Sequence, residues 1–195
     1  MRMLLALSVF CLTAPQAFAG EATSQYVNFN LDKCQQTEKP DGFVFEGAWR
    51  CKGIPGYDIF LSGADARNFA GFGKSADNNC AYGKTFNGFN SFNSPVEFRF
   101  KGKTPVAAIE RWTVVESPET PEKSITWLVV NKLANGTSCQ MHFVAGSFPN
   151  ANARARDIAD TMAQGFDCET GTPAFSSEIG PPDINLEPCK DQARE

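Results

Sequence analysis

The sequence predicts a mainly β fold of the α+β class. We expect an antiparallel meander of about six to eight strands, curled into a sheet or half-barrel, with one C-terminal α-helix packed on it. Three observations predict this fold. Short stretches that alternate apolar and polar residues follow one another between turns rich in Gly, Pro and Asn. One later stretch repeats apolar residues at helical spacing. The cysteines outside the N-terminal apolar run are even in number, which predicts stabilising disulfides.

The clearest strand pair covers residues 125–145. In the first strand one face carries Ile125, Trp127, Val129 and Leu133, and in the second one face carries Cys139, Met141, Phe143 and Ala145. Successive side chains of a strand point to opposite faces, so each row predicts one buried face. Asn135-Gly136 lies between the two runs and predicts a tight hairpin turn, because both residues tolerate a positive φ.

The helix is expected at about residues 150–164. Its apolar stripe consists of Ala151, Ala155, Ile158, Ala159, Met162 and Ala163. Asn150 or Asn152 would cap its start, and Gly165 would end it in a left-handed conformation. Arg154 with Asp157, and Arg156 with Asp160, would form exposed ion pairs. We expect a disulfide between Cys139 and Cys168 to hold the helix against the sheet.

Other stretches complete the predicted sheet. The expected strands are a short one within residues 26–31 and longer ones at 43–51, 57–61, 69–73, 96–101 and 106–116. Gly71 and Gly73 suit a bend or a bulge. Glu110 falls on the apolar face of its strand, and we expect it to pair with Arg111. The predicted organisation is a signal peptide at 1–19, a polar lead-in at 20–42, one β-rich domain with its helix at 43–168, and an irregular tail at 169–195 that Cys189 ties down.

The chain begins with a predicted secretory signal peptide. Arg2 precedes an apolar run of about ten residues, and Ala17-Phe18-Ala19 has the small residues that signal peptidase requires. Cleavage is expected between Ala19 and Gly20, and the run is too short for a membrane span. The protein is therefore expected in the periplasm or outside the cell. A net charge of −4 argues against a nucleic-acid partner.

The six remaining cysteines are expected to form disulfides. They are Cys34, Cys51, Cys80, Cys139, Cys168 and Cys189. An even count in an exported chain favours three bridges, whose connectivity the sequence leaves open. Zinc is the alternative, but no pair has the short spacing of a metal site and His142 is the only histidine. No metal and no cofactor are expected.

A repeated Phe-Asn motif is the candidate binding site. It consists of Phe86-Asn87, Phe89-Asn90 and Phe92-Asn93. A spacing of three fits neither a strand nor a long helix, so we expect an extended or irregular segment with the rings along one side. The rings either close one end of the core or form an exposed surface that binds a partner. In the second case the rings supply contact area and the amides supply hydrogen bonds.

No catalytic motif is complete in the sequence. His142 is expected to point away from the row of Met141 and Phe143, and neither Ser138 nor Ser147 lies in a nucleophile elbow. Two carboxylates could hydrolyse a glycoside without histidine. The candidates are Glu46, Asp58, Asp65, Glu97 and Glu110. No catalytic residue is assigned.

Two blocks of sequence carry a resemblance to a known group. One contains 104–112 and 127–133, and the other contains 139–168 with the segment 150–160; Trp49-Arg50-Cys51 precedes both. From Trp49 to Cys168 the chain resembles a group of functionally uncharacterised small exported proteins of alphaproteobacteria. The resemblance implies export and supplies no catalytic residues. The Phe-Asn motif and the Cys189 tail are not part of it.

A weaker likeness is to periplasmic inhibitors of C-type lysozyme. These are small disulfide-bonded β-barrels with an aromatic-x-Cys segment like Trp49-Arg50-Cys51. The C-terminal helix departs from that pattern, and the inhibitors' binding motif has no counterpart here.

The expected function is that of a non-enzymatic binding protein. Its partner would be a protein or a wall polymer in the cell envelope, and it could inhibit a hydrolase. The alternatives are a hydrolase that uses carboxylates and a structural protein that maintains envelope integrity.

Overall fold

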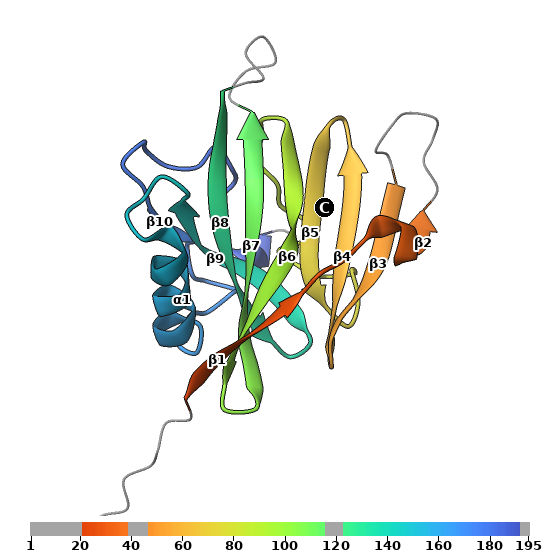
Figure 1. The fold of residues 1–195 in the computed structure, drawn as a ribbon, viewed down its shortest axis with the longest axis horizontal. Coiled ribbons are helices and arrows are strands. Elements are labelled where there is room, and N and C mark those ends of the chain that lie inside the picture. Colours follow the sequence, from red (N-terminus) through yellow and green to blue (C-terminus); the bar gives the residue numbers. More distant parts are fainter. Residues whose placement is uncertain (1–20, 39–46, 116–122, 192–195) are drawn as a thin grey trace, which may run out of the picture.

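The structure, a computed structural model, describes residues 21–38, 47–115 and 123–191. Within these residues the chain forms ten strands in two sheets, one α-helix and two short 3-10 helices (Figure 1). The strands are β1 (Ala22–Val27), β2 (Gln35–Glu38), β3 (Gly47–Ile54), β4 (Tyr57–Ala64), β5 (Arg67–Gly73), β6 (Asn90–Lys101), β7 (Thr104–Val115), β8 (Ser124–Ala134), β9 (Thr137–Ala145) and β10 (Ala174–Ser176). The α-helix is α1 (Ala151–Met162), and the 3-10 helices are Leu31–Lys33 and Cys189–Asp191. The predicted fold class is therefore confirmed.

The two sheets are both antiparallel meanders at their centres. One has the strand order β2-β3-β4-β5, and the other has the order β1-β6-β7-β8-β9-β10. Consecutive strands pair as expected within each meander. The exceptions are β1, which pairs with β6, and β10, which adds in parallel to β9. The predicted hairpin is also confirmed, since Asn135 and Gly136 have φ values of 54° and 78°.

The main core lies between the two sheets and is strongly aromatic. Phe72 of the smaller sheet meets Phe98 of the larger one edge to face, with ring centroids 5.7 Å apart. Trp112 and Trp127 lie on neighbouring strands of the larger sheet and are 1% and 3% exposed. The apolar faces predicted for the strands at 106–116 and 125–133 point into this core. Burial of these side chains is the main source of stability for the sandwich.

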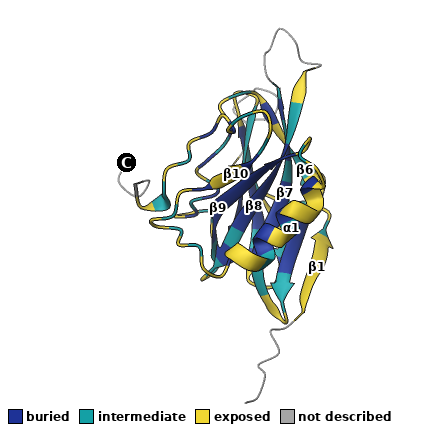
Figure 2. Ribbon diagram, turned by 90° about the vertical axis from the view of Figure 1, so that its left-hand side faces the viewer, coloured by how far each residue is buried: buried dark blue, intermediate teal, exposed yellow. Residues whose placement is uncertain are grey.

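A second core lies between the larger sheet and α1. Ala151, Ala155, Ile158 and Ala159 face the sheet, and Figure 2 shows the opposite side of the helix exposed. The predicted stripe is confirmed except at Met162, which is 40% exposed. The larger sheet is thus covered on both faces, which is why the residues of β8 and β9 are buried in almost uninterrupted runs.

The ends of α1 and one of its ion pairs differ from expectation. Asn150 is the N-cap residue, but it is left-handed and its side chain makes no capping bond. The helix does not end on a left-handed Gly165, because its C-cap, Ala163, is right-handed. Arg154 pairs with Asp157 as predicted, at 3.2 Å. Arg156 pairs with Glu97 instead of Asp160, because β6 lies close enough to offer a better-placed carboxylate.

A β-bulge in β9 divides the row of apolar residues predicted there. The register with β8 shifts between Val130 and Asn131. As a result Met141 packs under the helix, whereas Phe143 and Ala145 point into the inter-sheet core. The prediction that they share one face is wrong, because one extra residue in a strand reverses the alternation.

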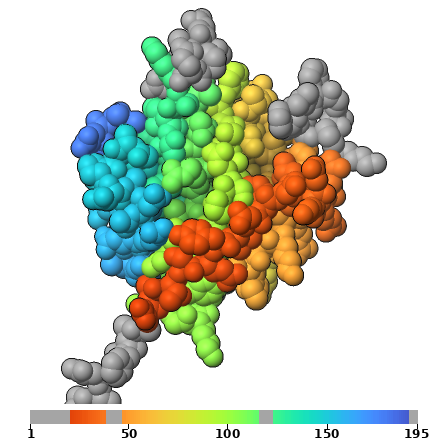
Figure 3. Space-filling model, in the orientation of Figure 1, coloured from red at the N-terminus to blue at the C-terminus, as the bar shows by residue number. Residues whose placement is uncertain are grey.

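The residues predicted to be a polar lead-in form parts of both sheets. β1 extends the larger sheet at one edge, and β2 extends the smaller sheet. Figure 3 shows this segment in red and orange, crossing the surface of the molecule between them. The signal peptide expected at 1–19 lies outside the described residues. Within the described residues no helix is long and apolar enough to cross a membrane.

All six expected cysteines are paired. The disulfides join Cys34 with Cys51, Cys80 with Cys189, and Cys139 with Cys168. The prediction for Cys139 and Cys168 is confirmed, and the predicted attachment of the tail through Cys189 is confirmed as well. The tail also carries β10, which was not predicted because a strand of three residues has no recognisable alternation.

Candidate functional site

The three rings of the Phe-Asn motif do not form a row on one surface. Phe86 is 1% exposed and packs on Trp112, Trp127 and Phe143, with centroids 5.7, 6.4 and 6.0 Å away. Phe92 is partly buried and stacks on Phe29 at 5.2 Å. Only Phe89 is well exposed, at 39%. The expectation that the rings lie along one side is wrong. The alternative, a place in the core, holds for Phe86, and Phe92 packs against the same core with its ring centroid 5.5 Å from that of Trp112.

The amides of the motif bind within the protein. Asn90 is buried; its side chain accepts from the backbone N–H of Asn68 at 2.9 Å and donates to the carbonyl of Gly88 at 2.9 Å. It therefore connects β5 to the start of β6. Asn87 donates to Asp183 at 2.8 Å, and Asn93 donates to Thr113 at 3.0 Å. A partner role for these residues stays a prediction, for which Phe89 offers the most accessible surface.

The single histidine has a serine partner that sequence spacing could not reveal. The imidazole Nε2 of His142 lies 2.9 Å from Oγ of Ser176 on β10. Its Nδ1 has no hydrogen-bond partner among the described residues, so no carboxylate orients the ring. Burial, with a contribution from the positive charge of Arg154, lowers the pKa of His142 to about 4. This pair is buried and lacks the third member of a catalytic triad.

Most carboxylates named from the sequence pair with arginine. Asp58 pairs with Arg50 at 2.5 Å, Asp65 with Arg67 at 3.2 Å and Glu97 with Arg156 at 2.7 Å. Glu46 lies outside the described residues. Each of these three carboxylates is therefore already engaged by a guanidinium of the same protein.

Glu110 is the exception. It is 1% exposed and points into the inter-sheet core, where Asn131 donates to its Oε1 at 3.0 Å. Burial raises the pKa of Glu110 to about 8, and the hydrogen bond from Asn131 opposes this shift in part. Arg111 points the other way and donates to Asn152, so the predicted Glu110–Arg111 pair is wrong. Adjacent residues of a strand face opposite sides.

The surface is hollowed around one loop, residues 74–84, here called the cysteine loop. Three neighbouring grooves border it. The disulfide groove, of about 480 Å³, is lined by residues that include Asn78, Cys80, Lys132, Thr137, Asp167, Glu169 and Cys189. The loop groove, of about 310 Å³, is lined by Ala76, Asn78, Asn79, Cys80, Tyr82, Gly83 and Cys189. The sheet groove, of about 370 Å³, is lined by residues that include Gln35, Glu38, Arg50, Phe60, Lys74, Ala76, Asp77 and Tyr82. Each groove shares lining residues with its neighbour, and Glu110 lines none of them.

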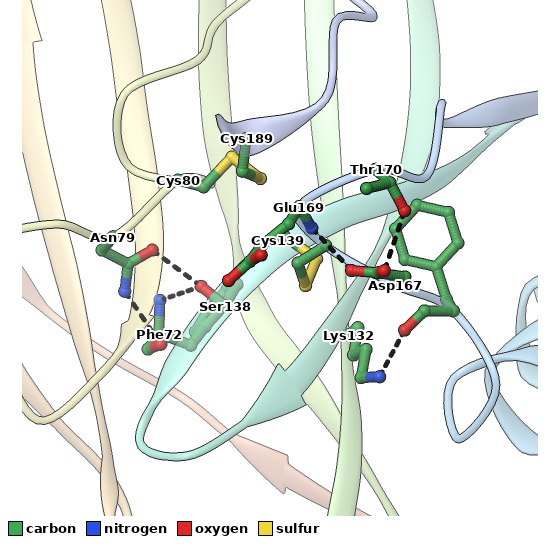
Figure 4. Close-up of a disulfide and its surroundings, with 12 residues drawn as sticks. Phe72, Asn79, Cys80, Lys132, Ser138, Cys139, Asp167, Glu169, Thr170 and Cys189 are labelled. Atoms are coloured by element: carbon green, nitrogen blue, oxygen red, sulfur yellow. Dashed lines mark hydrogen bonds between the residues drawn. A yellow bond between two sulfur atoms is a disulfide. The ribbon is translucent and has the colours of Figure 1, made fainter. Parts of the chain in front are cut away.

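The cysteine loop is held firmly against β5 and β9 (Figure 4). Asn79 donates to the carbonyl of Phe72 at 3.0 Å and accepts from the hydroxyl of Ser138 at 2.9 Å. That hydroxyl in turn accepts the backbone N–H of Phe72. Ser138 is therefore a structural residue. The grooves consequently have fixed walls, which reduces the entropy cost of binding a partner.

Glycine makes this close approach possible. A Cβ at Gly71 would lie 2.7 Å from Cβ of Tyr82 and 2.9 Å from Oδ1 of Asn79. A Cβ at Gly73 would lie 2.4 Å from the carbonyl oxygen of Gly136. The register of β4 and β5 is continuous, so these glycines form no bulge against β4. The glycines are needed because other segments pack directly on the backbone.

The disulfide groove combines both charges with two disulfides. Lys132 donates to the carbonyl of Phe166 on one side. The Asp167 carboxylate accepts from the hydroxyl of Thr170 at 2.8 Å and from the backbone N–H of Glu169 at 2.9 Å (Figure 4). These bonds lower the pKa of Asp167. The groove therefore offers charged and neutral hydrogen-bonding groups at fixed positions.

The described residues contain no group of three or more His, Cys, Asp or Glu side chains that could hold a metal ion. Protein-family models, curated proteins and solved structures contain no match to this chain. The candidate site therefore rests on the geometry of the chain itself.

Proposed function

We propose that this is an exported, non-enzymatic protein that binds a protein or wall-polymer partner in the cell envelope. The surface that binds is the one around the cysteine loop. The observation that carries the proposal is the joining of three grooves around a single loop that a disulfide and buried hydrogen bonds hold in place. Concave surfaces of fixed shape are where proteins bind ligands and partners.

Export is part of the same proposal. The sequence pattern of residues 1–19 supports it, and three disulfides fit an oxidising compartment. Secretion of a reporter fused to residues 1–25 tests export directly. A reporter that stays in the cytoplasm would contradict it.

Affinity capture tests binding. The oxidised chain from Gly20 is the bait, and envelope extract and wall polymer are offered to it. The variant Ala76→Arg with Glu169→Arg fills the grooves, because Ala76 lines two of them and Glu169 lines the third. The matched control is Ala153→Arg with Glu178→Arg, at two exposed positions outside the grooves.

We expect the parent and the control to hold a partner that the groove variant loses. Capture that is equal for all three proteins would place the binding site elsewhere, with Phe89 as the next position to change. Failure of every bait to hold anything would contradict the binding proposal and favour a structural role in the envelope.

A carboxylate hydrolase is the second candidate. The observation that favours it is the burial of the Glu110 carboxyl with an amide as its only hydrogen-bond partner among the described residues, which raises its pKa. General acids of glycosidases are carboxyl groups kept neutral in the same way. The burial of Glu110 counts against it, since a substrate must reach the acid. Release of reducing sugar from wall polymer by the parent, and its loss in Glu110→Gln, would support the hydrolase over the binding protein.

A further inference from the structure

The two open sheets have four edge strands, and three of them are protected against pairing with another chain. β10 has only three residues. β2 has four residues, ends in Glu38 and contains a register shift. The outer edge of β5 is already hydrogen-bonded to other segments. The backbone N–H of Asn68 donates to the side chain of Asn90, that of Phe72 to the hydroxyl of Ser138, and that of Lys74 to the carbonyl of Gly136. Short length, charge, bulges and covering segments are the usual means by which proteins block edge pairing.

The fourth edge, β1, has none of these protections. It spans six residues, Ala-Thr-Ser-Gln-Tyr-Val, without charge or proline. Its register with β6 is regular from Ala22 to Val27. Five of its residues are exposed and the sixth is intermediate. Among the described residues, no strand pairs with its outer edge. The outward backbone donors and acceptors of β1 are therefore free to pair with another strand.

The side of β1 that faces the helix layer is fixed in place. The guanidinium of Arg156 donates to the hydroxyl of Tyr26 at 2.7 Å, and the hydroxyl of Ser24 donates to Glu97 at 2.5 Å. Arg99 donates to Ser24 and pairs with Asp160 of α1 at 2.5 Å. Both Glu97 and Arg99 are less than one-tenth exposed. This network holds β1 in its regular register on β6, so its free edge is already in the extended conformation that pairing requires.

We propose that a second copy of this chain pairs with β1 in an antiparallel manner, across a two-fold axis that extends the larger sheet. Directly opposed residues of antiparallel strands point to the same face, so a two-fold axis must place one residue of β1 opposite the same residue of the second copy. Near the middle of β1 this residue is Ser24 in the first register or Gln25 in the second. Tyr26 then lies opposite Ala22 of the second copy in the first register and opposite Ser24 in the other. No charged side chains oppose each other in either register, because β1 carries none.

Tyr26 supports a second copy as the occupant. Tyr26 is 51% exposed, although it lies on a strand and its hydroxyl already accepts a hydrogen bond. In both registers a small residue faces it, which leaves room for the ring to pack across the interface. No residue that lines the three grooves belongs to β1, so a dimer would present two sets of grooves at once. Two linked sites increase the apparent affinity for a repetitive partner.

Sedimentation analysis of the oxidised chain from Gly20, from about 1 to about 500 µM, tests this proposal over the range expected for a small interface. We expect a reversible monomer–dimer equilibrium. Thr23→Lys with Gln25→Lys places lysines opposite each other in both registers and should raise the dissociation constant at least about tenfold. The matched control is Ser91→Lys with Thr104→Lys, at exposed strand positions outside β1.

A charge exchange makes the test specific to β1. Thr23→Glu with Gln25→Glu should also be monomeric alone, and an equimolar mixture with the lysine variant should form a heterodimer. Circular dichroism checks the folding of each variant. The lysine pair and the glutamate pair each oppose like charges in both registers, so whichever of the two folds tests the edge. A parent chain that is monomeric throughout this range would overturn the proposal. A dimer that the lysine variants leave unchanged would overturn it too, because another surface would then hold the two copies together.

Discussion

Replacement of Glu110 by glutamine should remove a large part of the dependence of stability on pH. The pKa of Glu110 is about 8 in the folded protein, against 4.5 for the exposed group. The folded state therefore binds more protons than the unfolded state between these two values. The stabilisation is fully present below about pH 4.5, falls as pH rises and is lost above about pH 8.

The magnitude follows from the size of the shift. Each pKa unit corresponds to about 1.4 kcal/mol, so the shift of Glu110 amounts to roughly 4 to 5 kcal/mol between acidic and alkaline pH. Glutamine has nearly the same shape and never ionises. The variant should thus be close to the parent in stability near pH 4.5 and more stable than the parent by a few kcal/mol near pH 9.

Guanidinium unfolding followed by circular dichroism at several pH values measures this difference. Subtraction of the parent from the variant at each pH cancels the contributions of the other titrating groups. Glu178→Gln, at an exposed position in the tail, is the control and should show no such trend. Parallel stability profiles for the parent and Glu110→Gln would refute the burial argument, since Glu110 would then titrate as an exposed carboxyl does.

Two further predictions concern the site. His142 is the only histidine, so its ring gives a single set of NMR signals, which should titrate near pH 4. Because the pKa of His142 is lower in the folded than in the unfolded protein, the neutral ring favours the folded state above the unfolded pKa near 6.5. This contribution to stability is lost as the pH falls through about 4. A midpoint near 6.5 would show that the ring is accessible to water. Gly71→Ala should cost about 1 to 3 kcal/mol in unfolding free energy, because the new Cβ meets Tyr82 and Asn79. Gly165→Ala is the control and should cost far less, because its Cβ would meet nothing closer than 4.0 Å. If Gly71→Ala lowers the unfolding free energy no more than Gly165→Ala does, the cysteine loop moves aside to make room for the new Cβ.

The local elements were predictable where a short period in the sequence decides them. The Asn135-Gly136 turn, the apolar face of α1 and the rows on β7 and β8 follow from positive φ, from the helical repeat and from alternation. The same local rules failed at β9, because a single bulge reverses the side on which each residue lies. They failed at β1 as well, because an edge strand needs no apolar row and looks like a polar segment.

The candidate site could be predicted only in part. The six cysteines were evident, whereas Gly71 and Gly73 were interpreted only as suited to a bend or a bulge. The reason for these glycines was not, since their neighbours in space are Asn79, Tyr82 and Gly136. The Phe-Asn motif attracted attention by its spacing, yet spacing cannot say that Phe86 fills the core while Phe89 stays in solvent. Exposure depends on which other segments cover a residue.

By itself, the sequence determined the mainly β class, the single helix and the pairing of the cysteines into disulfides. These follow from side-chain period and from the even cysteine count. The tertiary structure alone decided that Glu110 is buried, that Ser176 meets His142 and that three grooves join around the cysteine loop. It also decided which sheet edges stay open. The physical reason is that burial, pKa and edge protection depend on contacts between residues far apart in the chain, which no local pattern specifies.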